Sequence, residues 1–347
     1  MRSLLLGCFV SCLPVMAMAA PQWCPVSPAD AATAMGQVPA SLTAALDSKP
    51  SPMRQVHTEG KLPGDSIRER SGEAEKQLPI MRDAAYAWRA GAGDAYLDLA
   101  MRYLNAWVAV YHPDYDPIDE TKFDAMIETY AIVAPKMDAR SHAAADRLFR
   151  TWATGYVRRM DRTKIFGSGP AAKNARSNWQ SHRIKLVTLM AVALDDDTLF
   201  ADARRLFRNQ VAANIHPDGT VNDFVDRDAV SYVLYDLQPL LQASLAAKTR
   251  GEDWYSYESP TGSSLAKAAA WVKPYATGEK THQEFVHSII AFDAKRADAG
   301  ETGFSGPFDP ASAGTFMWTV SALDPSYLPL AQSLKDAAPS FITLCGN

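Results

Sequence analysis

The chain has 347 residues, of which 47% are hydrophobic and 21% are charged, a composition that predicts a folded globular protein and excludes disorder, a collagen helix or a coiled coil. It carries 35 basic against 39 acidic residues, a formal net charge of −4. No general positive field is available to hold nucleic acid or an anionic membrane, so neither is expected as a partner, and an anionic ligand would need a local group of basic residues.

The first 20 residues have the pattern of a secretory signal peptide. Arg2 precedes an apolar run over residues 4–16, which ends in the small residues Ala17-Met18-Ala19-Ala20. We therefore expect cleavage near Ala19 or Ala20 and a periplasmic or secreted protein, residues 21–347. No later segment has the roughly 20 uninterrupted apolar residues that a spanning helix needs, so no membrane insertion is expected.

Two cysteines remain after this cleavage, Cys24 near the start and Cys345 near the end of the chain. In an oxidising compartment such a pair favours a disulfide that joins the two ends. No Cys/His cluster has zinc-ligand spacing, and no glycine-rich phosphate loop is present. The sequence thus predicts no metal site and no cofactor.

Helical periodicity dominates the chain after a Pro/Ser/Ala-rich lead-in to about residue 52 and a polar loop at 57–65. Apolar residues recur at three-and-four spacing from Ser71, and Gly91-Ala92-Gly93-Asp94 separates a helix ending near Trp88 from one over 96–107. Alternating β-branched runs are almost absent. Further helices are predicted near 120–134, 140–160, 173–194, 198–214, 226–249, 262–275, 281–295 and 311–323.

Short breaks between these helices favour antiparallel hairpins, stacked as a solenoid or closed as an α/α toroid. No shift in composition marks a domain boundary. The prediction is one all-α domain over residues 21–347.

Basic residues cluster in one part of this acidic chain. Between Asp161 and Asp195 there is no Asp or Glu, and six basic residues fall in that window. A solvated helix face is the ordinary explanation of such a run, but the length of the window and its interleaved polar residues favour a site for anionic groups. The six are Arg162, Lys164, Lys173, Arg176, Arg183 and Lys185.

Two groups of polar residues are candidates for chemistry. Asn174, Asn178 and His182 follow at four-residue spacing, which places them on one face of the predicted helix. A single histidine is more often a structural residue, but two amides and an imidazole on one helix face are suited to the polar wall of a binding site. The second group is Arg227 near the start of the helix predicted over 226–249, followed by two tyrosines one turn apart, which amphipathic packing would also explain.

These residues carry a resemblance to a known family. The run Asn178-Trp179-Gln180-Ser181-His182-Arg183, followed about fifty residues later by Arg227 and the Tyr232-x-x-Tyr235 pair, resembles the alginate lyase superfamily of polysaccharide lyases, in particular family five and more closely family thirty-eight. Segments 57–60 and 116–121 are similar to cleft loops of these lyases. The resemblance covers about residues 50–325 and implies an (α/α) toroid or incomplete barrel, active on a 4-linked uronan, above all polymannuronate.

The resemblance also implies roles for individual residues. Asn178, His182 and Arg227 would surround the substrate carboxylate. Tyr235 would act as acid, and either Tyr235 or His182 as base. Arg227 precedes Tyr232 by five residues and Tyr235 by eight, which leaves open the choice of catalytic tyrosine.

Several more residues would bind the polymer if the resemblance holds. Lys173, Arg176 and Arg183 would meet carboxylates at flanking subsites, and His57, Tyr115, Trp179 and Gln180 would contact the sugar. Glu59, with Asp119 and Glu120, would brace the loops or bind hydroxyls. We expect an anionic polysaccharide as the partner and a monomeric enzyme.

Eliminative cleavage removes the weakly acidic C5 proton beside a carboxylate and expels O4, so it needs donors for the carboxylate, a base and an acid. In mannuronate the C5 proton and O4 lie on the same side, so one tyrosine can serve both; a separate histidine base would serve uronates in which the two lie on opposite sides. The sequence therefore also allows a glucuronan or other polyuronate lyase, a glycoside hydrolase using paired carboxylates among Glu59, Asp119, Glu120 and Asp226, or a non-catalytic uronan-binding protein.

Overall fold

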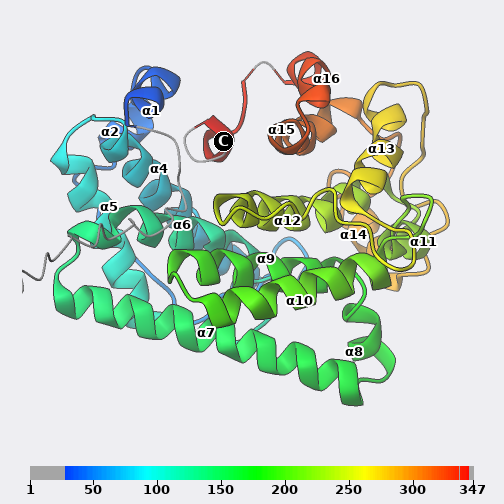
Figure 1. The fold of residues 1–347 in the computed structure, drawn as a ribbon, viewed down its shortest axis with the longest axis horizontal. Helices are drawn as coiled ribbons and strands as arrows, with labels where there is room; N and C mark the ends of the chain where they lie inside the picture. The colour runs from blue at the N-terminus through cyan, green and yellow to red at the C-terminus, as the bar shows by residue number, and fades with distance from the viewer. Residues whose placement is uncertain (1–27, 336, 344–347) are drawn as a thin grey trace, which may run out of the picture.

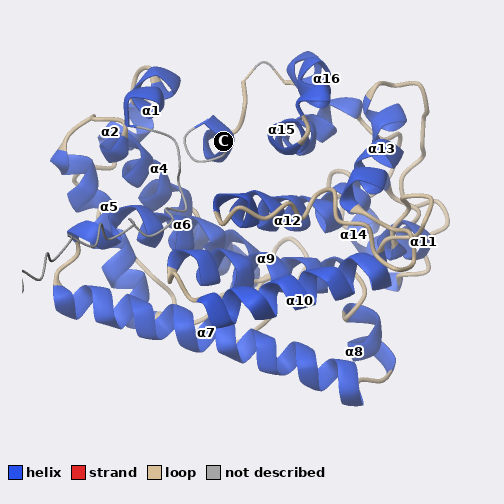
Figure 2. Ribbon diagram, viewed as in Figure 1, coloured by secondary structure: helices blue, strands red, loops and turns tan. Residues whose placement is uncertain are grey.

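The computed structural model describes residues 28–335 and 337–343 (Figures 1 and 2). The predicted signal peptide, Cys24 and Cys345 lie outside these residues, and so does the predicted disulfide. Within the described part the chain is helical, without a strand and with two isolated β-bridges, Ile215 with Val221 and Gln283 with Pro307.

The helices follow one another through the whole described chain. They are α1 (Pro28–Met35), α2 (Ala40–Ala44), α3 (Ser66–Glu75), α4 (Gln77–Arg89), α5 (Asp94–Val110), α6 (Asp124–Val133), α7 (Ala139–Phe166), α8 (Gly169–Asn174), α9 (Asn178–Ala193), α10 (Asp197–Asn214), α11 (Asn222–Arg227), α12 (Val230–Thr249), α13 (Leu265–Ala276), α14 (Ala291–Asp298), α15 (Gly314–Leu323), α16 (Leu328–Leu334) and α17 (Ser340–Thr343). Short 3-10 helices cover Thr121–Phe123, Ala134–Lys136, Pro310–Ala313 and Pro325–Tyr327.

These helices form two layers around a ring. Helices α4, α6, α9, α12 and α15 each pack against the next one in this order and form the inner layer. The outer layer consists of α5 on α4, α7 and α10 on α9, α13 on α12, and α16 on α15; α7 and α10 lie below α9 in Figure 1. The short α17 contacts both α1 and α15, and α1 contacts α4. This arrangement is the predicted all-α toroid of helical hairpins.

Helix α9 is the centre of the fold because apolar residues dominate its sequence from Ile184 onward. Ile184, Leu186, Val187, Leu189 and Met190 are each at most 1% exposed. They pack against α6, α7, α10 and α12 together. An all-round apolar helix must be covered on every side, so only the polar first turn of α9 is left to face a pocket.

Two predicted helices are interrupted in the structure. The helix expected over 173–194 divides into α8 and α9 at Ser177, whose backbone is extended, because the carboxylate of Asp223 accepts the backbone N–H of Asn178 at 2.6 Å and starts a new helix there. The helix expected over 226–249 divides at Asp228, whose φ of 52° ends α11. The helix expected over 281–295 is reduced to α14, and residues 281–290 form a loop.

A buried glutamate holds the loop between α5 and α6. Glu120 is 0% exposed. Its carboxylate accepts hydrogen bonds from the Tyr111 hydroxyl at 2.9 Å, the Trp152 indole at 2.8 Å, the Tyr156 hydroxyl, and the backbone N–H of Tyr115 at 3.2 Å. Tyr115 has a φ of 71°, a conformation that a side chain other than glycine keeps only when its surroundings enforce it.

We expect Glu120→Ala to lower the free energy of unfolding by about 3–5 kcal/mol, because it leaves three buried donors without an acceptor. Urea denaturation followed by circular dichroism measures this loss. The matched control is Glu73→Ala, whose side chain is 73% exposed and pairs with Lys76; we expect its unfolding free energy to match the wild type. Equal stability of the two variants would contradict the bracing role of Glu120.

Candidate active site

A pocket of about 720 Å³ opens between α3, the first turn of α9, the α11–α12 junction, α14 and the neighbouring loops. Its wall combines aromatic rings with charged groups of both signs, five basic and three acidic. The lining residues are Thr58, Glu59, Gly60, Lys61, Arg68, Glu69, Gly72, Glu75, Ile118, Thr121, Lys122, Asn178, Trp179, Arg227, Ser231, Tyr232, Tyr235, Phe285, Phe292, Arg296, Thr302, Gly303 and Phe304.

Both candidate tyrosines line this pocket from the first turns of α12, but their hydroxyl groups differ in hydrogen bonding. The Tyr232 hydroxyl accepts a hydrogen bond from Arg296 at 3.2 Å, and the guanidinium of Arg227 lies 4.0 Å from the centre of its ring. No side chain within residues 28–335 and 337–343 hydrogen-bonds to the Tyr235 hydroxyl. The structure therefore leaves the Tyr235 hydroxyl available to a ligand and engages that of Tyr232.

Burial sets the protonation state of these hydroxyls. It raises the pKa of Tyr235 well above its ordinary value, with a further rise from Tyr232, while the charge of Arg296 acts to lower that pKa. Burial also raises the pKa of Tyr232, and Arg227 and Arg296 oppose it. Tyr235 is therefore a neutral phenol at neutral pH, and the cation that acts to lower its pKa is Arg296.

Arg227 reaches the pocket from the last residue of α11, not from the start of α12 as predicted. Its guanidinium pairs with the carboxylates of Asp293 and Asp223, the latter at 3.4 Å. Asp223 also accepts the backbone N–H of Asn178 at 2.6 Å and the side-chain amide of Asn178 at 2.7 Å. One buried carboxylate thus holds the amide and the guanidinium beside each other. Because Asn174 ends α8, it does not share the face of Asn178 and His182, which corrects the predicted three-residue row.

His182 lies behind the pocket rather than on its wall. Its ring is 4% exposed and packs against Tyr235 with 4.5 Å between ring centres. Nδ1 is 2.7 Å from the Thr121 hydroxyl oxygen, whereas Nε2 is buried and has no hydrogen-bond partner in the described part of the chain. Burial, followed by the charge of Lys185, lowers the pKa of His182 well below its ordinary value, so the ring is neutral.

Four basic residues of the pocket were not predicted from the sequence: Lys61, Arg68, Lys122 and Arg296. Arg68 and Arg296 lie far apart in the chain, yet both pair with Glu301, Arg296 through Nε at 2.5 Å. Each has an ordinary sequence context, without a motif that would single it out. The pocket also has a phenylalanine wall, in which Phe285 and Phe304 stack with 4.9 Å between ring centres.

The predicted sugar-binding residues fall into two groups. Glu59 and Trp179 line the pocket, and burial raises the pKa of Glu59. His57 is not among the lining residues, and its Nδ1 is 2.8 Å from Asp119. Asp119 also accepts the backbone N–H of Glu59 at 2.7 Å, so this carboxylate braces the loop.

Three further predicted residues do not line the pocket. The ring of Tyr115 lies 3.9 Å from the guanidinium of Arg159. Arg183 donates to the side-chain oxygen of Gln180 at 3.3 Å, and burial lowers the pKa of Arg183. These contacts are within the protein.

The six basic residues of the acid-free window do not form one patch. Lys185 is 3% exposed and donates to Asp124 at 2.8 Å, and Lys173 pairs with Asp226 at 3.1 Å. Arg162 and Lys164 are exposed on α7. The acids that compensate two of these charges come from other parts of the chain, which a count along the sequence does not detect.

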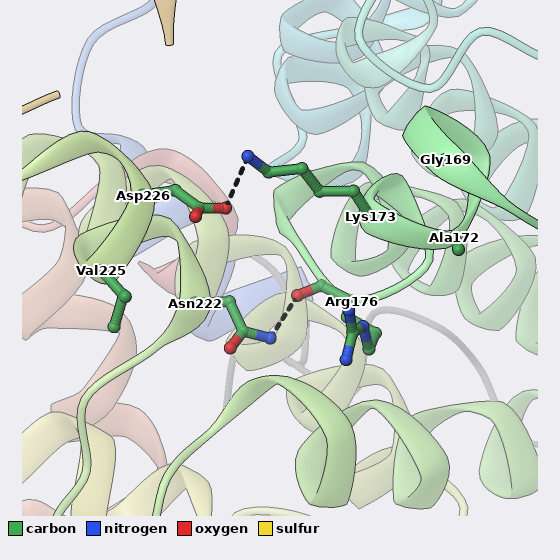
Figure 3. A pocket seen from close by; sticks show the side chains of 7 residues that line it. All are labelled: Gly169, Ala172, Lys173, Arg176, Asn222, Val225 and Asp226. Atoms are coloured by element: carbon green, nitrogen blue, oxygen red, sulfur yellow. Dashed lines mark hydrogen bonds and ion pairs between the residues drawn. The ribbon is translucent and has the colours of Figure 1, made fainter. Parts of the chain in front are cut away.

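Lys173 and Arg176 instead line a second pocket of about 480 Å³ between α8 and α11 (Figure 3). Asn222, the first residue of α11, donates its amide to the backbone oxygen of Arg176 at 2.7 Å and so joins α11 to the turn that follows α8. The apolar side of this pocket is Val225, which is 64% exposed. No described residue accepts a hydrogen bond from the Arg176 guanidinium.

Two further properties of the described residues concern metal binding and helices that could cross a membrane. In the described residues no group of three or more His, Cys, Asp or Glu side chains is placed to hold a metal ion. No helix among them is long and apolar enough to cross a membrane.

Comparisons with known proteins agree with the fold. An alginate lyase from Bacteroides ovatus superposes with a TM-score of 0.60 at 16% identity, over 91% of this chain and 92% of its own. Alginate lyase A1-III from Sphingomonas species A1 gives 0.59 at 16% identity, over 88% and 89%. A tyrosine-to-phenylalanine variant of A1-III, complexed with a tetrasaccharide, gives 0.56 at 17% identity, over 75% and 79%. Curated protein sequences give no significant match.

At these identities the solved structures establish the fold alone. Membership follows from the sequence model of the family described as alginate lyase, which matches residues 24–282, most of the chain. The protein therefore belongs to the alginate lyase family and is a polysaccharide lyase.

Proposed function

We propose that this lyase cleaves poly-β-D-mannuronate by β-elimination, with Tyr235 as both base and acid. The observation that carries the proposal is Tyr235, whose hydroxyl has no side-chain partner among the described residues and which lines the same pocket as Asn178 and Arg227. One aromatic hydroxyl next to donors for a carboxylate is what a one-residue elimination needs.

In the proposed reaction the phenolate form of Tyr235 takes the C5 proton and becomes the phenol. The electrons of the C5–H bond move first toward the carboxylate, where Arg227 and the second amide hydrogen of Asn178 stabilise the developing negative charge. The C4=C5 double bond then forms as the C4–O4 bond breaks. Tyr235 returns its proton to O4, so the products are one saturated chain end and one 4,5-unsaturated uronate.

Stereochemistry connects this mechanism to mannuronate. The C5 proton and O4 of mannuronate lie on the same side of the ring, within reach of a single hydroxyl. In guluronate they lie on opposite sides, and a second base is needed, whereas glucuronate, the C2 epimer of mannuronate, has the same arrangement at C4 and C5. The buried Nε2 of His182 is not on the pocket wall, which weighs against a guluronate lyase that uses this histidine as the second base.

Hydrolysis and binding without cleavage have less support in the pocket. A glycoside hydrolase would need an acid and a second carboxylate across the bond, but Asp119 holds the 57–59 loop and Glu120 is buried under aromatic rings. A non-catalytic uronan-binding protein is inconsistent with membership of a lyase family.

Substrate choice is tested by incubating the purified enzyme with polymannuronate, polyguluronate and glucuronan and recording ultraviolet absorbance from the new double bond. We expect absorbance to rise fastest with polymannuronate. A faster rise with glucuronan or polyguluronate would overturn the mannuronate assignment. Reducing ends without absorbance would indicate hydrolysis, and no change in either would indicate binding without cleavage.

The pH dependence follows from the raised pKa of Tyr235. The base form is the phenolate, whose fraction below the pKa rises about tenfold per pH unit, so we expect kcat/KM on polymannuronate to increase steadily from about pH 6 to pH 9. Initial rates from absorbance, with circular dichroism at each pH as the folding control, measure this. A plateau that starts near pH 6–7 would instead assign the base to an imidazole.

The second pocket would provide a flanking subsite for a uronate carboxylate, with Arg176 as its donor. We expect Arg176→Ala to raise KM for long polymannuronate by about three- to tenfold with little change in kcat, because a side chain remote from the reacting atoms contributes uniform binding. The measurement compares KM for polymer and trisaccharide. An equal rise for both lengths, or a fall in kcat alone, would contradict a flanking role.

A further inference from the structure

A proline interrupts the hydrogen bonds of α12 one turn after the proposed catalytic tyrosine. Pro239 lies in the interior of α12 and is buried. Proline has no N–H, so the carbonyl four residues earlier loses its helical donor. That carbonyl belongs to Tyr235. An unpaired buried carbonyl requires another donor from its surroundings.

The side chain beside this carbonyl is His182. Its ring packs against Tyr235, and its Nε2 is buried without a partner in the described residues. The Tyr235 backbone opposes the lowering of the His182 pKa by burial, as a carbonyl close to the imidazole would. A backbone carbonyl can accept a hydrogen bond only from a nitrogen that carries a proton, so the tautomer of His182 decides whether the two groups pair.

The opposite side of the ring faces a charged group that bears on this tautomer. The Lys185 ammonium, on α9 one turn beyond His182, donates to the Thr121 carbonyl at 2.7 Å, the Thr121 hydroxyl oxygen at 3.0 Å and Asp124 at 2.8 Å. These contacts use its three hydrogens. Since the Thr121 oxygen accepts from the ammonium, its own hydrogen is directed to Nδ1 of His182 at 2.7 Å.

The electrostatics point the same way. A positive charge near Nδ1 disfavours a proton on that nitrogen and favours one on the far nitrogen. Hydrogen bonding and charge therefore both place the single proton of the neutral ring on Nε2, toward the carbonyl that Pro239 leaves unpaired.

We propose that His182 is a positioning residue: Lys185 and Thr121 hold it as the Nε2–H tautomer, and its Nε2–H supports the Tyr235 carbonyl and so sets the place of the Tyr235 side chain in the pocket. The role in catalysis rests on the proposed function of Tyr235. The tautomer and its control by Lys185 do not, because they are properties of the substrate-free protein.

Nitrogen-15 NMR of histidine-labelled enzyme without substrate tests the tautomer, with the His182 signals assigned by their loss in His182→Gln. We expect a neutral ring protonated at Nε2 from pH 5 to pH 8, and a shift toward the Nδ1–H form in Thr121→Val, which keeps the shape of the side chain. A ring protonated at Nδ1 in the wild type, or no change in Thr121→Val, would overturn the proposal.

Kinetics test the link to Tyr235 through a double-mutant cycle with Pro239→Ala, which returns an N–H to the Tyr235 carbonyl. We expect His182→Leu to lower kcat about fiftyfold while KM stays within twofold. In the Pro239→Ala background the same substitution should lower kcat less than fivefold. His182→Gln, whose amide can reach the position of Nε2, should retain kcat within fivefold. Equal losses in both backgrounds, or a rise in KM, would mean that His182 contacts the substrate.

The cycle uses whichever uronan the enzyme cleaves. If the enzyme did not cleave polymannuronate, the proposed substrate would be overturned. The NMR measurement and the double-mutant cycle would still test this inference.

Discussion

Tyr235→Phe is expected to lower kcat on polymannuronate by at least about 10³-fold, the upper range of a general acid–base contribution, while the dissociation constant for a mannuronate oligosaccharide stays within about twofold. The variant removes one oxygen that has no partner among the described side chains, so neither packing nor a protein hydrogen bond is lost. Absorbance assays give kcat, and calorimetric titration with a tetrasaccharide gives the binding constant.

Tyr232→Phe is the matched control for this experiment. It removes the hydroxyl that accepts a hydrogen bond from Arg296 at 3.2 Å but keeps the ring under Arg227. We expect a loss of kcat of about tenfold or less, since the lost bond affects the position of Arg296 and not the reacting atoms. A larger loss in Tyr232→Phe than in Tyr235→Phe would transfer the acid and base roles to Tyr232.

Arg227→Lys is expected to lower kcat/KM by about 10²- to 10³-fold, the usual effect of removing one oriented donor from a developing negative charge. Lysine keeps the positive charge between Asp223 and Asp293, so neither carboxylate is left without a cation. It lacks the planar fork that can hold these carboxylates and a substrate carboxylate in fixed directions at once. Absorbance assays with polymannuronate measure the loss.

Arg205→Lys provides the comparison at an outer surface. Arg205 pairs with Asp161 and Asp202, and its side chain is 41% exposed. We expect its kcat/KM and melting temperature to equal those of the wild type. If Arg227→Lys also kept full activity, the carboxylate would have to be bound by other donors, with Arg296 as the first candidate.

The local part of the fold was predictable from the sequence. Three-and-four spacing of apolar residues predicted the end of α4, and α5 and α10, within a few residues, because each buries one face against the ring. The breaks at Ser177 and Asp228 were not predicted. The first depends on the carboxylate of Asp223 in α11. The second depends on the left-handed backbone of Asp228, which the residues around it do not reveal.

The candidate site was predictable where its residues are neighbours in sequence. Asn178, Tyr232 and Tyr235 were predicted from short motifs and line one pocket. Arg296 and Arg68 were not, because each is an ordinary basic residue until the ring closes and places both beside Glu301.

By itself the sequence determined that the chain is helical, since this follows from periodicity and short-range hydrogen bonding. The tertiary structure decided which charges remain available to a ligand. The acid-free window gave the clearest case: Lys185 is held by Asp124 and Lys173 by Asp226. Charge pairing depends on distance in space, and a toroid brings together acids and bases that the sequence keeps far apart.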